Sequence, residues 1–355
     1  MKKKRILVDL SILKNVNCGL GQIALNYGNF YKNEFMPSPL FDVYLLVPKK
    51  FIGQFGSNVK YIESAWWYKF FPCLLPKMTV WHAIHQRSHF SPFWKSTKYL
   101  LTIHDFNFAY EKTGKKRDKY LSDIQKNINR ADKITCISHF AKADTERLAD
   151  TKGKSIDVIY NGVEHLDQDL AQKPSFVQNE KPFFFTIGEV KEKKNFHTLI
   201  DLMKLFPEKM LYIAGNKGNN YAQQIVQRIK TEHIENVFLT GIVTNNERIW
   251  LYRNCEAFLF PSLFEGFGLP IIEAMSFGKP VFSSTKTSLK EIGGNCAFFW
   301  DNFTPEHMQE VINKNLDTFY KNPNLAKQNI DYAMSFSYGR HIKTYWQIYL
   351  QLLQF

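Results

Sequence analysis

Residues 256–278 read EAFLFPSLFEGFGLPIIEAMSFG and decide the fold of the second half of the chain. The apolar run 257–261 predicts a buried strand, and a glycine-containing loop at 265–269 follows it. A helix is then expected from Pro270, because a proline in the first helical turn loses no intrahelical hydrogen bond. Gly278 falls where that helix should end, since glycine readily adopts the left-handed conformation of a helix C-terminus. The order strand, loop, helix is typical of a parallel α/β sheet.

The loop and the helix carry two carboxylates at a fixed spacing. Glu265 precedes the expected helix and Glu273 lies one turn inside it. Between them, the backbone N–H groups of residues 267–269 point out of a helix N-terminus, which favours an anion. The pattern therefore predicts a diphosphate at the helix end, with a carboxylate on each side to accept hydrogen bonds from sugar hydroxyls.

This segment resembles the donor-binding signature of retaining GT-B glycosyltransferases of family 4, the glycosyl transferases group 1. That signature is a Glu, seven residues and a Glu within P-S-x-x-E-G-F-G-L-P-x-x-E-A-M-x-x-G-x-P-V. The matching positions are Pro261, Ser262, residues 265–270, residues 273–275, Gly278, Pro280 and Val281. The resemblance implies that Glu265 is catalytic and binds the donor sugar. It further implies that Glu273 binds the ribose diol, and that Phe267, Gly268 and Leu269 bind the diphosphate.

The net charge of +13 is concentrated in the first half of the chain. Residues 1–175 contain 27 Lys and Arg against 16 Asp and Glu, a net +11, which leaves +2 for the remainder. Such asymmetry favours an anionic partner: nucleic acid, anionic lipid or a phosphorylated substrate. A solvated basic face is the alternative. No signature of a nucleic-acid-binding fold accompanies the charge, so we expect no nucleic-acid partner.

An aromatic segment lies in the same basic half. Residues 65–75 read AWWYKFFPCLL, in which Trp66, Trp67, Phe70 and Phe71 surround a lysine. Tryptophan and phenylalanine beside basic residues suit a membrane interface, although the same run also fits a helix in a core. We expect the protein to dock on an anionic membrane surface.

Cysteine usage and the N-terminal segment indicate the compartment. The five cysteines form no C-x-x-C pair, which favours reduced thiols in the cytosol. The start MKKKRILVDLSIL is better interpreted as a first buried strand than as a signal peptide, because Asp9 and Lys14 interrupt its apolar run. The expected location is cytoplasmic, peripheral on the inner face of the plasma membrane.

Short apolar runs recur at the spacing of parallel α/β domains. We expect strands at 6–10, 43–47, 79–84, 99–103, 134–137, 158–160, 183–187, 210–214, 237–239, 257–260 and 280–283. The predicted fold is α/β: two Rossmann-like doubly wound domains that, as the GT-B resemblance implies, face each other across a cleft. The expected domains are 1–170 on the acceptor side and 171–337 for the nucleotide sugar. A helix at 338–355 is expected to return to the first domain.

Two further candidate sites lie in the first half. Gly19 and Gly21 follow the first strand, where glycine lets the backbone approach a phosphate; an ordinary turn is the alternative. His104 ends the strand Thr102-Ile103-His104-Asp105, where it could donate to a sugar hydroxyl, with Asp105 fixing its orientation. Family resemblance implies that the glycines border the donor and that His104 is catalytic, contacting the donor sugar.

The second domain offers more donor-binding positions. The family motif G-R-x-x-x-x-K-[GN] aligns with residues 188–195, where Lys194 matches the catalytic, phosphate-binding lysine. Glu189 stands in place of the arginine, which reverses one charge. Gly215 and Val243 lie in turns that match family positions around the nucleotide.

No metal site or resident cofactor is expected. Asp167-Gln168-Asp169 spells D-x-D, but it falls in the linker and is interpreted as a solvated turn. The co-substrate implied is a nucleotide sugar, either GDP-mannose or a UDP-sugar. The resemblance implies transfer to a hydroxyl of a glycan or lipid-linked acceptor in cell-surface polysaccharide synthesis. Alternatives are another GT-B enzyme, such as a nucleotide-sugar epimerase or a phosphorylase, and a basic nucleic-acid-binding protein.

Overall fold

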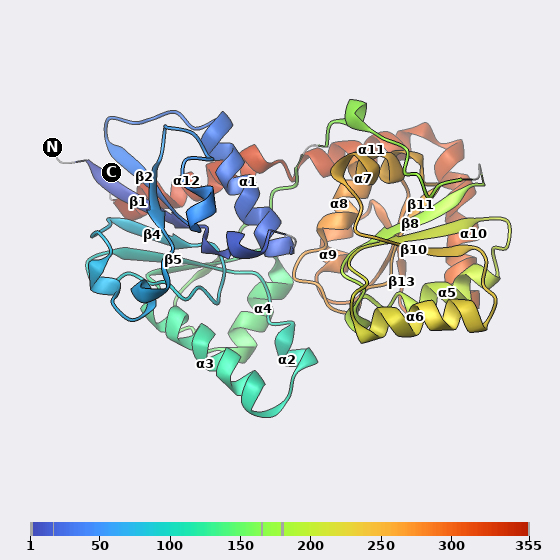
Figure 1. Ribbon diagram of the computed structural model, residues 1–355, viewed down its shortest axis with the longest axis horizontal. Helices are drawn as coiled ribbons and strands as arrows, with labels where there is room; N and C mark the ends of the chain where they lie inside the picture. Colours follow the sequence, from blue (N-terminus) through green and yellow to red (C-terminus); the bar gives the residue numbers. More distant parts are fainter. Residues whose placement is uncertain (1–2, 17, 165, 179–180, 354–355) are drawn as a thin grey trace. The chain divides into compact units, whose positions relative to one another are not determined.

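The computed structural model describes residues 3–16, 18–164, 166–178 and 181–353. The chain folds into two compact units (Figure 1). Unit 1 comprises Met1–Gly162 and Tyr338–Phe355, and unit 2 comprises Val163–Ser337. Each unit is built around its own sheet, and all strand pairs described in both sheets are parallel.

Unit 1 contains a seven-stranded sheet in the order β3-β2-β1-β4-β5-β6-β7. Its strands are β1 (Lys4–Asp9), β2 (Phe41–Val47), β3 (Lys60–Glu63), β4 (Val80–Ala83), β5 (Lys98–Ile103), β6 (Lys133–Cys136) and β7 (Ile156–Val158). The strand order reverses between β1 and β4, and ligands of doubly wound sheets bind at the carboxyl ends of the strands at such a point.

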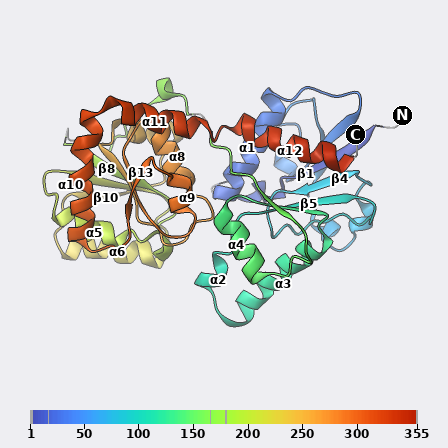
Figure 2. The ribbon, with the colours of Figure 1, turned by 180° about the vertical axis from the view of Figure 1, so that it is seen from behind.

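The helices of unit 1 include the last helix of the chain. They are α1 (Gly19–Asn33), α2 (Phe108–Glu111), α3 (Gly114–Arg130), α4 (His139–Leu148) and α12 (Tyr338–Leu353), with short 3₁₀ turns η1 (Ser11–Asn15), η2 (Lys49–Phe51), η3 (Trp66–Lys69) and η4 (Pro72–Leu74). Helix α12 packs against α1 and β4 (Figure 2). The C-terminal helix therefore completes the unit in which the chain begins.

Unit 2 contains a six-stranded sheet in the order β10-β9-β8-β11-β12-β13. Its strands are β8 (Phe183–Ile187), β9 (Met210–Ala214), β10 (Val237–Gly241), β11 (Ala257–Phe260), β12 (Val281–Ser284) and β13 (Ala297–Trp300). Its helices are α5 (His197–Lys204), α6 (Asn220–Thr231), α7 (Asn245–Asn254), α8 (Leu269–Ser276), α9 (Leu289–Gly293), α10 (Pro305–Lys321) and α11 (Pro323–Met334), with 3₁₀ turns η5 (Gln168–Leu170) and η6 (Glu192–Lys194).

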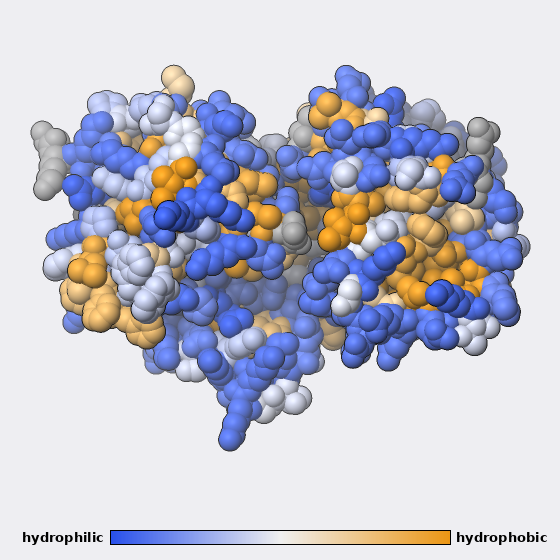
Figure 3. Space-filling view, viewed as in Figure 1, coloured by the Kyte–Doolittle hydropathy of each residue, from blue (hydrophilic) through white to orange (hydrophobic). Residues whose placement is uncertain are grey.

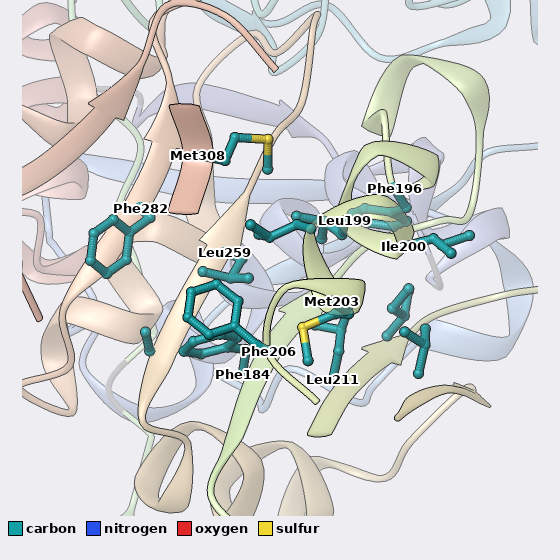
Figure 4. Packing of buried hydrophobic residues seen from close by; sticks show 14 of the residues in the cluster. Phe184, Phe196, Leu199, Ile200, Met203, Phe206, Leu211, Leu259, Phe282 and Met308 are labelled. Carbon is teal, nitrogen blue, oxygen red and sulfur yellow. The ribbon is translucent and has the colours of Figure 1, made fainter. Parts of the chain in front are cut away.

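The core of unit 2 is aromatic and aliphatic, and it fixes the sheet against α5 and α10. Phe184 of β8, Leu259 of β11 and Phe282 of β12 are fully buried among side chains of these helices (Figure 4). Buried strands of this kind need no polar alternation, because both faces of a parallel sheet are covered. This packing gives a rigid support for the loops at the carboxyl ends of the strands.

The predicted fold class is confirmed. Every expected strand is present to within about two residues at either end, and the expected helix end at Gly278 has the left-handed φ of +66°. There the N–H of Gly278 bonds the carbonyl of Met275 and that of Lys279 bonds Ala274, which closes α8 as a Schellman motif. Two edge strands were not predicted, β3 and β13. Both have only four residues. Strand β3 (KYIE) mixes polar and apolar residues, whereas β13 (AFFW) is wholly apolar and the sequence reasoning missed it.

In the part of the chain that the structure describes, we find no helix of the length and apolarity that a membrane span requires.

Candidate functional site: the β8–β11 switch point of unit 2

The strand order of unit 2 reverses between β8 and β11, and two of the predicted site residues follow these two strands. Lys194 ends η6, after β8, and Glu265 lies in the loop after β11. Open α/β sheets bind ligands beyond the carboxyl ends of their strands at this position. Residues 71 positions apart in sequence are thus brought to one edge of the sheet.

Lys194 and Glu265 form a direct ion pair. The Nζ atom of Lys194 lies 2.5 Å from Oε1 of Glu265, and the side chains are only 11% and 15% exposed. Ser262 Oγ donates a second hydrogen bond to the same oxygen, at 2.7 Å. The ammonium also lies 4.9 Å from the ring centroid of Phe260, where the aromatic face favours a cation. A cation and a carboxylate are therefore held side by side in a poorly solvated place.

The loop that carries Glu265 is fixed by hydrogen bonds to its neighbours. The backbone N–H of Glu265 donates to Thr287 Oγ1 at 3.0 Å. The hydroxyl of Ser288, which is fully buried, donates to the carbonyls of Glu265 and Phe267. The N–H of Leu263 bonds the carbonyl of Lys193, which ties this loop to the η6 turn. The two functional loops therefore support each other.

Helix α8 begins directly after this loop. Gly268 is its N-cap, with a φ of +103°, and Leu269 and Pro270 are the first helical residues. A Cβ at Gly268 would lie 2.7 Å from Leu289, so the position suits glycine on both counts. Pro270 has no N–H, and the N–H of Ile271 bonds the carbonyl of Gly268. The amides of Gly268 and Leu269 are therefore the ones that this helix N-terminus offers to an anion, and the helix dipole adds positive potential there. Phe267 is buried and anchors the turn.

Glu273 lies inside α8 and is paired with α7. Its Oε2 atom accepts a hydrogen bond of 2.8 Å from the hydroxyl of Tyr252, and its Oε1 atom lies 3.4 Å from NH1 of Arg248. The Glu273 side chain is 14% exposed. Sequence reasoning missed Arg248 and Tyr252, although their i, i+4 spacing places both on one face of α7.

The turns after β8, β9 and β10 pack closely together. The N–H of Gly215 bonds the carbonyl of Gly241, and a Cβ at Gly215 would lie 1.8 Å from the carbonyl oxygen of Gly188. Position 215 therefore needs glycine, because the turns after β8 and β9 leave no room for a side chain there. Val243 precedes α7, whose N-terminus is closed by a capping box between Thr244 and Glu247.

Glu189, which replaces the arginine of the family motif, is half exposed. Its carboxylate pairs with Lys191 at 2.8 Å, and the side chains are 50% and 49% exposed. The negative charge of Glu189 is therefore balanced by Lys191 in an exposed ion pair. Lys194 does not take part in that pair, because it pairs with Glu265.

In unit 1, the glycines after β1 start helix α1. Cys18 is the N-cap, and its thiol accepts a hydrogen bond from the N–H of Gly21. A Cβ at Gly21 would lie 2.0 Å from the carbonyl oxygen of Asn15, whereas one at Gly19 would meet nothing within 4 Å. Gly21 is thus fixed by packing of η1 on α1, and Gly19 lies in open space at the end of the helix.

His104 follows β5 and is almost fully buried. Its Nε2 atom donates to the carbonyl of Ile84 at 2.7 Å, and its backbone N–H donates to Gln86. Burial lowers the pKa of His104 to about 4, against a smaller raising effect of the bond to Ile84. The ring is therefore neutral at pH 7 with its proton on Nε2. The expectation that it donates to a sugar hydroxyl is corrected: Nδ1 of this tautomer can only accept. The Ile84 carbonyl holds the Nε2 side of the ring.

His82, at the end of β4, belongs to the interface with α12. It is hydrogen-bonded to the hydroxyl of Tyr349 at 2.6 Å and to Thr102 at 2.8 Å, and its ring stacks on Tyr345. On the same helix, His341 contacts the hydroxyl of Tyr27 and the carbonyl of Tyr160. These buried polar contacts fix α12 in unit 1.

The aromatic segment of unit 1 is exposed. The segment folds into the 3₁₀ turns η3 and η4. Five of its large apolar side chains are exposed, and we call them the aromatic patch: Trp66 (65% exposed), Trp67 (41%), Phe70 (70%), Phe71 (57%) and Leu74 (62%). Figure 3 shows apolar surface at the lower left of the view of unit 1. The alternative interpretation of this run as a core helix is therefore wrong.

Among the described residues, no group of three or more His, Cys, Asp and Glu side chains is arranged to hold a metal ion. The D-x-D sequence forms the start of η5, where the Asp167 side chain accepts from the N–H of Asp169 and all three residues are exposed. The interpretation of this sequence as a solvated turn is confirmed.

Two sequence families match the chain. Residues 167–336 match "Glycosyl transferases group 1" and residues 60–165 match "Glycosyltransferase Family 4". The chain therefore carries the two domains of the group 1, family 4 glycosyltransferases, which confirms the resemblance drawn from the donor-binding segment.

Curated relatives are similar over part of their length. The chain is 27% identical over 222 residues to the serotype-specific mannosyltransferase WbdA of Escherichia coli, which covers 55% of this chain and 25% of that protein. It is 26% identical over 221 residues to the O-antigen chain mannosyltransferase RfbU of Salmonella typhimurium, covering 61% and 60%. The match to this chain thus covers a quarter of the length of WbdA and three fifths of the length of RfbU.

Solved structures share the fold across nearly the whole chain. Sucrose-phosphate synthase from Thermosynechococcus elongatus has a TM-score of 0.74 at 15% identity, covering 99% of this chain and 100% of that one. Anabaena HepE in complex with UDP and glucose has a TM-score of 0.72 at 17% identity, covering 99% of each chain. The two Rossmann-like units are thus those of the GT-B fold.

Proposed function

We propose that this protein is a retaining, metal-independent glycosyltransferase. It transfers a hexosyl group from a nucleotide-diphosphate sugar to a hydroxyl of a glycan or lipid-linked acceptor, in the synthesis of a cell-surface polysaccharide. The observation that supports the proposal best is the Lys194–Glu265 pair at the β8–β11 switch point, next to the N-terminus of α8. A cation and helix amides suit the diphosphate, and a carboxylate suits the sugar hydroxyls.

The proposed reaction needs no protein nucleophile. The acceptor oxygen bonds to C1 of the donor sugar on the face from which the diphosphate departs. The C1–O bond breaks as its electron pair passes to the diphosphate, and the acceptor proton moves to a leaving-group oxygen. Lys194 and the α8 amides stabilise the growing negative charge, and Glu265 orients the sugar. Within unit 1, the proposed role of His104 is to accept a hydrogen bond from a sugar hydroxyl at Nδ1.

The proposed donor is a mannosyl or glucosyl nucleotide. The relatives WbdA and RfbU are named mannosyltransferases, which supports GDP-mannose. The solved HepE complex contains UDP and glucose, which keeps a UDP-sugar as the alternative. A thermal-shift screen with GDP, UDP and their sugars identifies the donor, because a ligand that binds only the folded state raises the melting temperature.

The two glutamates are expected to separate binding from turnover. Glu273→Ala should raise KM for the donor about tenfold with little change in kcat, because the ribose contact is equal in ground and transition states. Glu265→Ala should mainly lower kcat, by roughly thirtyfold or about 2 kcal/mol, since its bonds to the sugar strengthen in the transition state. Steady-state kinetics with the identified donor tests this. Wild-type kinetics in both variants would refute the assignment.

We further propose that unit 1 docks on an anionic membrane surface that presents the acceptor. The aromatic patch supplies exposed apolar rings, and Lys69 lies within it. Burial is the main cause that lowers the pKa of His89, and the charges of Lys69 and Arg87 lower it further against the opposing charge of Asp123. Two cations therefore lie near His89. Charge attracts such a surface to anionic lipid, and ring insertion holds it there.

Vesicle binding tests this membrane proposal. The protein should sediment with anionic phosphatidylglycerol vesicles, less so as salt is added, since each basic residue near the surface contributes ~1 kcal/mol. Trp66→Ser with Trp67→Ser should reduce binding further, while Met36→Ser, at an 80% exposed position outside the patch, should not. Equal binding to neutral and anionic vesicles at low salt would exclude the membrane surface as partner.

A further inference from the structure

The carboxylate of Glu273 is held from one side by two residues of α7. Tyr252 donates to Oε2 at 2.8 Å, and Arg248 lies 3.4 Å from Oε1. Tyr252 is fully buried, and the side chains of Arg248 and Glu273 are 16% and 14% exposed. Both oxygens are thus engaged by donors that can hardly move, so rotation of the carboxylate about its last bond is restricted.

The two donors leave the carboxylate able to accept more. Each carboxylate oxygen has two acceptor sites, and α7 uses one on each. One acceptor site therefore remains on each oxygen of Glu273. The directions of these two sites are set by the plane of the carboxylate, which α7 holds in place. Two parallel acceptors in one plane match the two hydroxyls of a vicinal diol, in the same way that a carboxylate matches a bidentate donor.

The charge and protonation of the group suit this task. The guanidinium of Arg248 lies near two carboxylates, 3.4 Å from Glu273 and 3.9 Å from Glu164, and the attraction to Glu273 is the main cause that raises the pKa of Arg248. Burial, followed by the nearby carboxylate, raises the pKa of Tyr252 well above its ordinary value. Tyr252 therefore remains a hydrogen-bond donor at neutral pH.

We propose that Arg248 and Tyr252 are positioning residues that fix Glu273 to recognise the cis-diol of the donor ribose, and so select ribonucleotides over deoxyribonucleotides. The inference rests on the proposed function, in which Glu273 binds the ribose. It adds that the selectivity depends on α7, which holds the carboxylate, as well as on the carboxylate itself.

The test compares a nucleoside diphosphate with its 2′-deoxy and 3′-deoxy forms, using GDP or UDP according to which binds. Dissociation constants from titration calorimetry give a ribo-to-deoxy ratio for each variant. The wild type should prefer the ribonucleotide by about tenfold, the loss of one hydrogen bond to a charged group. Tyr252→Phe, which removes one hydroxyl, should reduce this preference at least threefold.

A matched variant separates positioning from stability. Tyr320→Phe also removes a hydroxyl of unit 2, one that donates to the carbonyl of Glu256 at 2.6 Å. It should lower the melting temperature without changing the ribo-to-deoxy ratio. If Tyr252→Phe is destabilised but keeps the wild-type ratio, the contact is only structural and the inference is overturned.

Glu273→Gln distinguishes this failure from failure of the proposed function. If it abolishes the preference while Tyr252→Phe retains it, Glu273 binds the ribose without help from α7. If Glu273→Gln keeps the wild-type ratio, or if the wild type does not discriminate, the ribose assignment of Glu273 is wrong and the inference falls with it. Arg248→Lys keeps the charge but loses the planar donor, so a lowered ratio in this variant would support positioning by geometry.

Discussion

Lys194→Ala is expected to lower kcat/KM by about a hundredfold, equivalent to ~3 kcal/mol of transition-state stabilisation. The lysine is the cation that the structure places at the switch point, at 2.5 Å from Glu265 and largely buried. Glu189 occupies the position at which the family motif has an arginine, so we expect no second phosphate contact from that position. Steady-state kinetics with the donor varied measures the effect.

Three measurements control this expectation. Lys191→Ala, which breaks an exposed pair with Glu189, should keep kcat/KM within about twofold. Glu189→Arg should leave donor binding unchanged or improve it, because it restores a positive charge. Since Lys194→Ala leaves a buried carboxylate without its cation, unfolding must be measured as well. A folded Lys194→Ala with kcat/KM within twofold of wild type would show that another residue holds the diphosphate.

The donor-binding segment could be predicted from sequence because its constraints are local. Pro270 fits only the first turn of a helix, and Gly278 has a left-handed conformation that other residues rarely adopt. The apolar run of β11 is buried on both faces, so it has a strong signal. Helix α12 spans Tyr338–Leu353 of the helix expected at 338–355, and the last two residues lie outside the described part of the chain.

Contacts between distant segments could not be predicted in this way. Nothing local to Glu273 shows that Arg248 and Tyr252 donate to it, because they lie 25 and 21 residues away in the sequence, on a different helix. The tautomer of His104 depends on the carbonyl of Ile84, which belongs to a neighbouring strand end. Exposure of the aromatic patch is likewise a tertiary property, since the same composition also fits a buried helix.

Unit 1 is expected to lose stability between pH 7 and pH 5, because it contains four buried neutral histidines. Burial lowers the pKa of His85 to about 3 and those of His104 and His341 to about 4, and it lowers the pKa of His82 well below the ordinary value. In the unfolded chain each of these groups has a pKa near ~6.5. Below that value the unfolded chain binds more protons than the folded one, so the free energy of unfolding falls as the pH falls.

The expected loss is large. Each histidine contributes 1.36 kcal/mol per pH unit below ~6.5, which gives about 2 kcal/mol at pH 5 and roughly 6 kcal/mol for His85, His104 and His341 together. His82 acts in the same direction. Asp9 opposes this, because burial raises its pKa in the folded state and its protonation then stabilises unit 1 as the pH falls. One carboxyl does not offset four histidines. Carboxylates with lowered pKa, such as Glu232 at about 2, lose their contribution only below this pH window.

Hydrogen exchange at pH 7 and pH 5, corrected for intrinsic rates, locates the effect. Amides of β4, β5 and α12 should lose protection in acid, whereas those of β8 and β11 should lose less, because His233 of unit 2 is exposed and His197, whose pKa is lowered by burial, is only partly buried. His85→Gln should reduce the slope of unfolding free energy with pH by about one histidine's share, ~1.36 kcal/mol per unit. Equal acid sensitivity in the two units, or an unchanged slope in folded His85→Gln, would show that these histidines are not the cause.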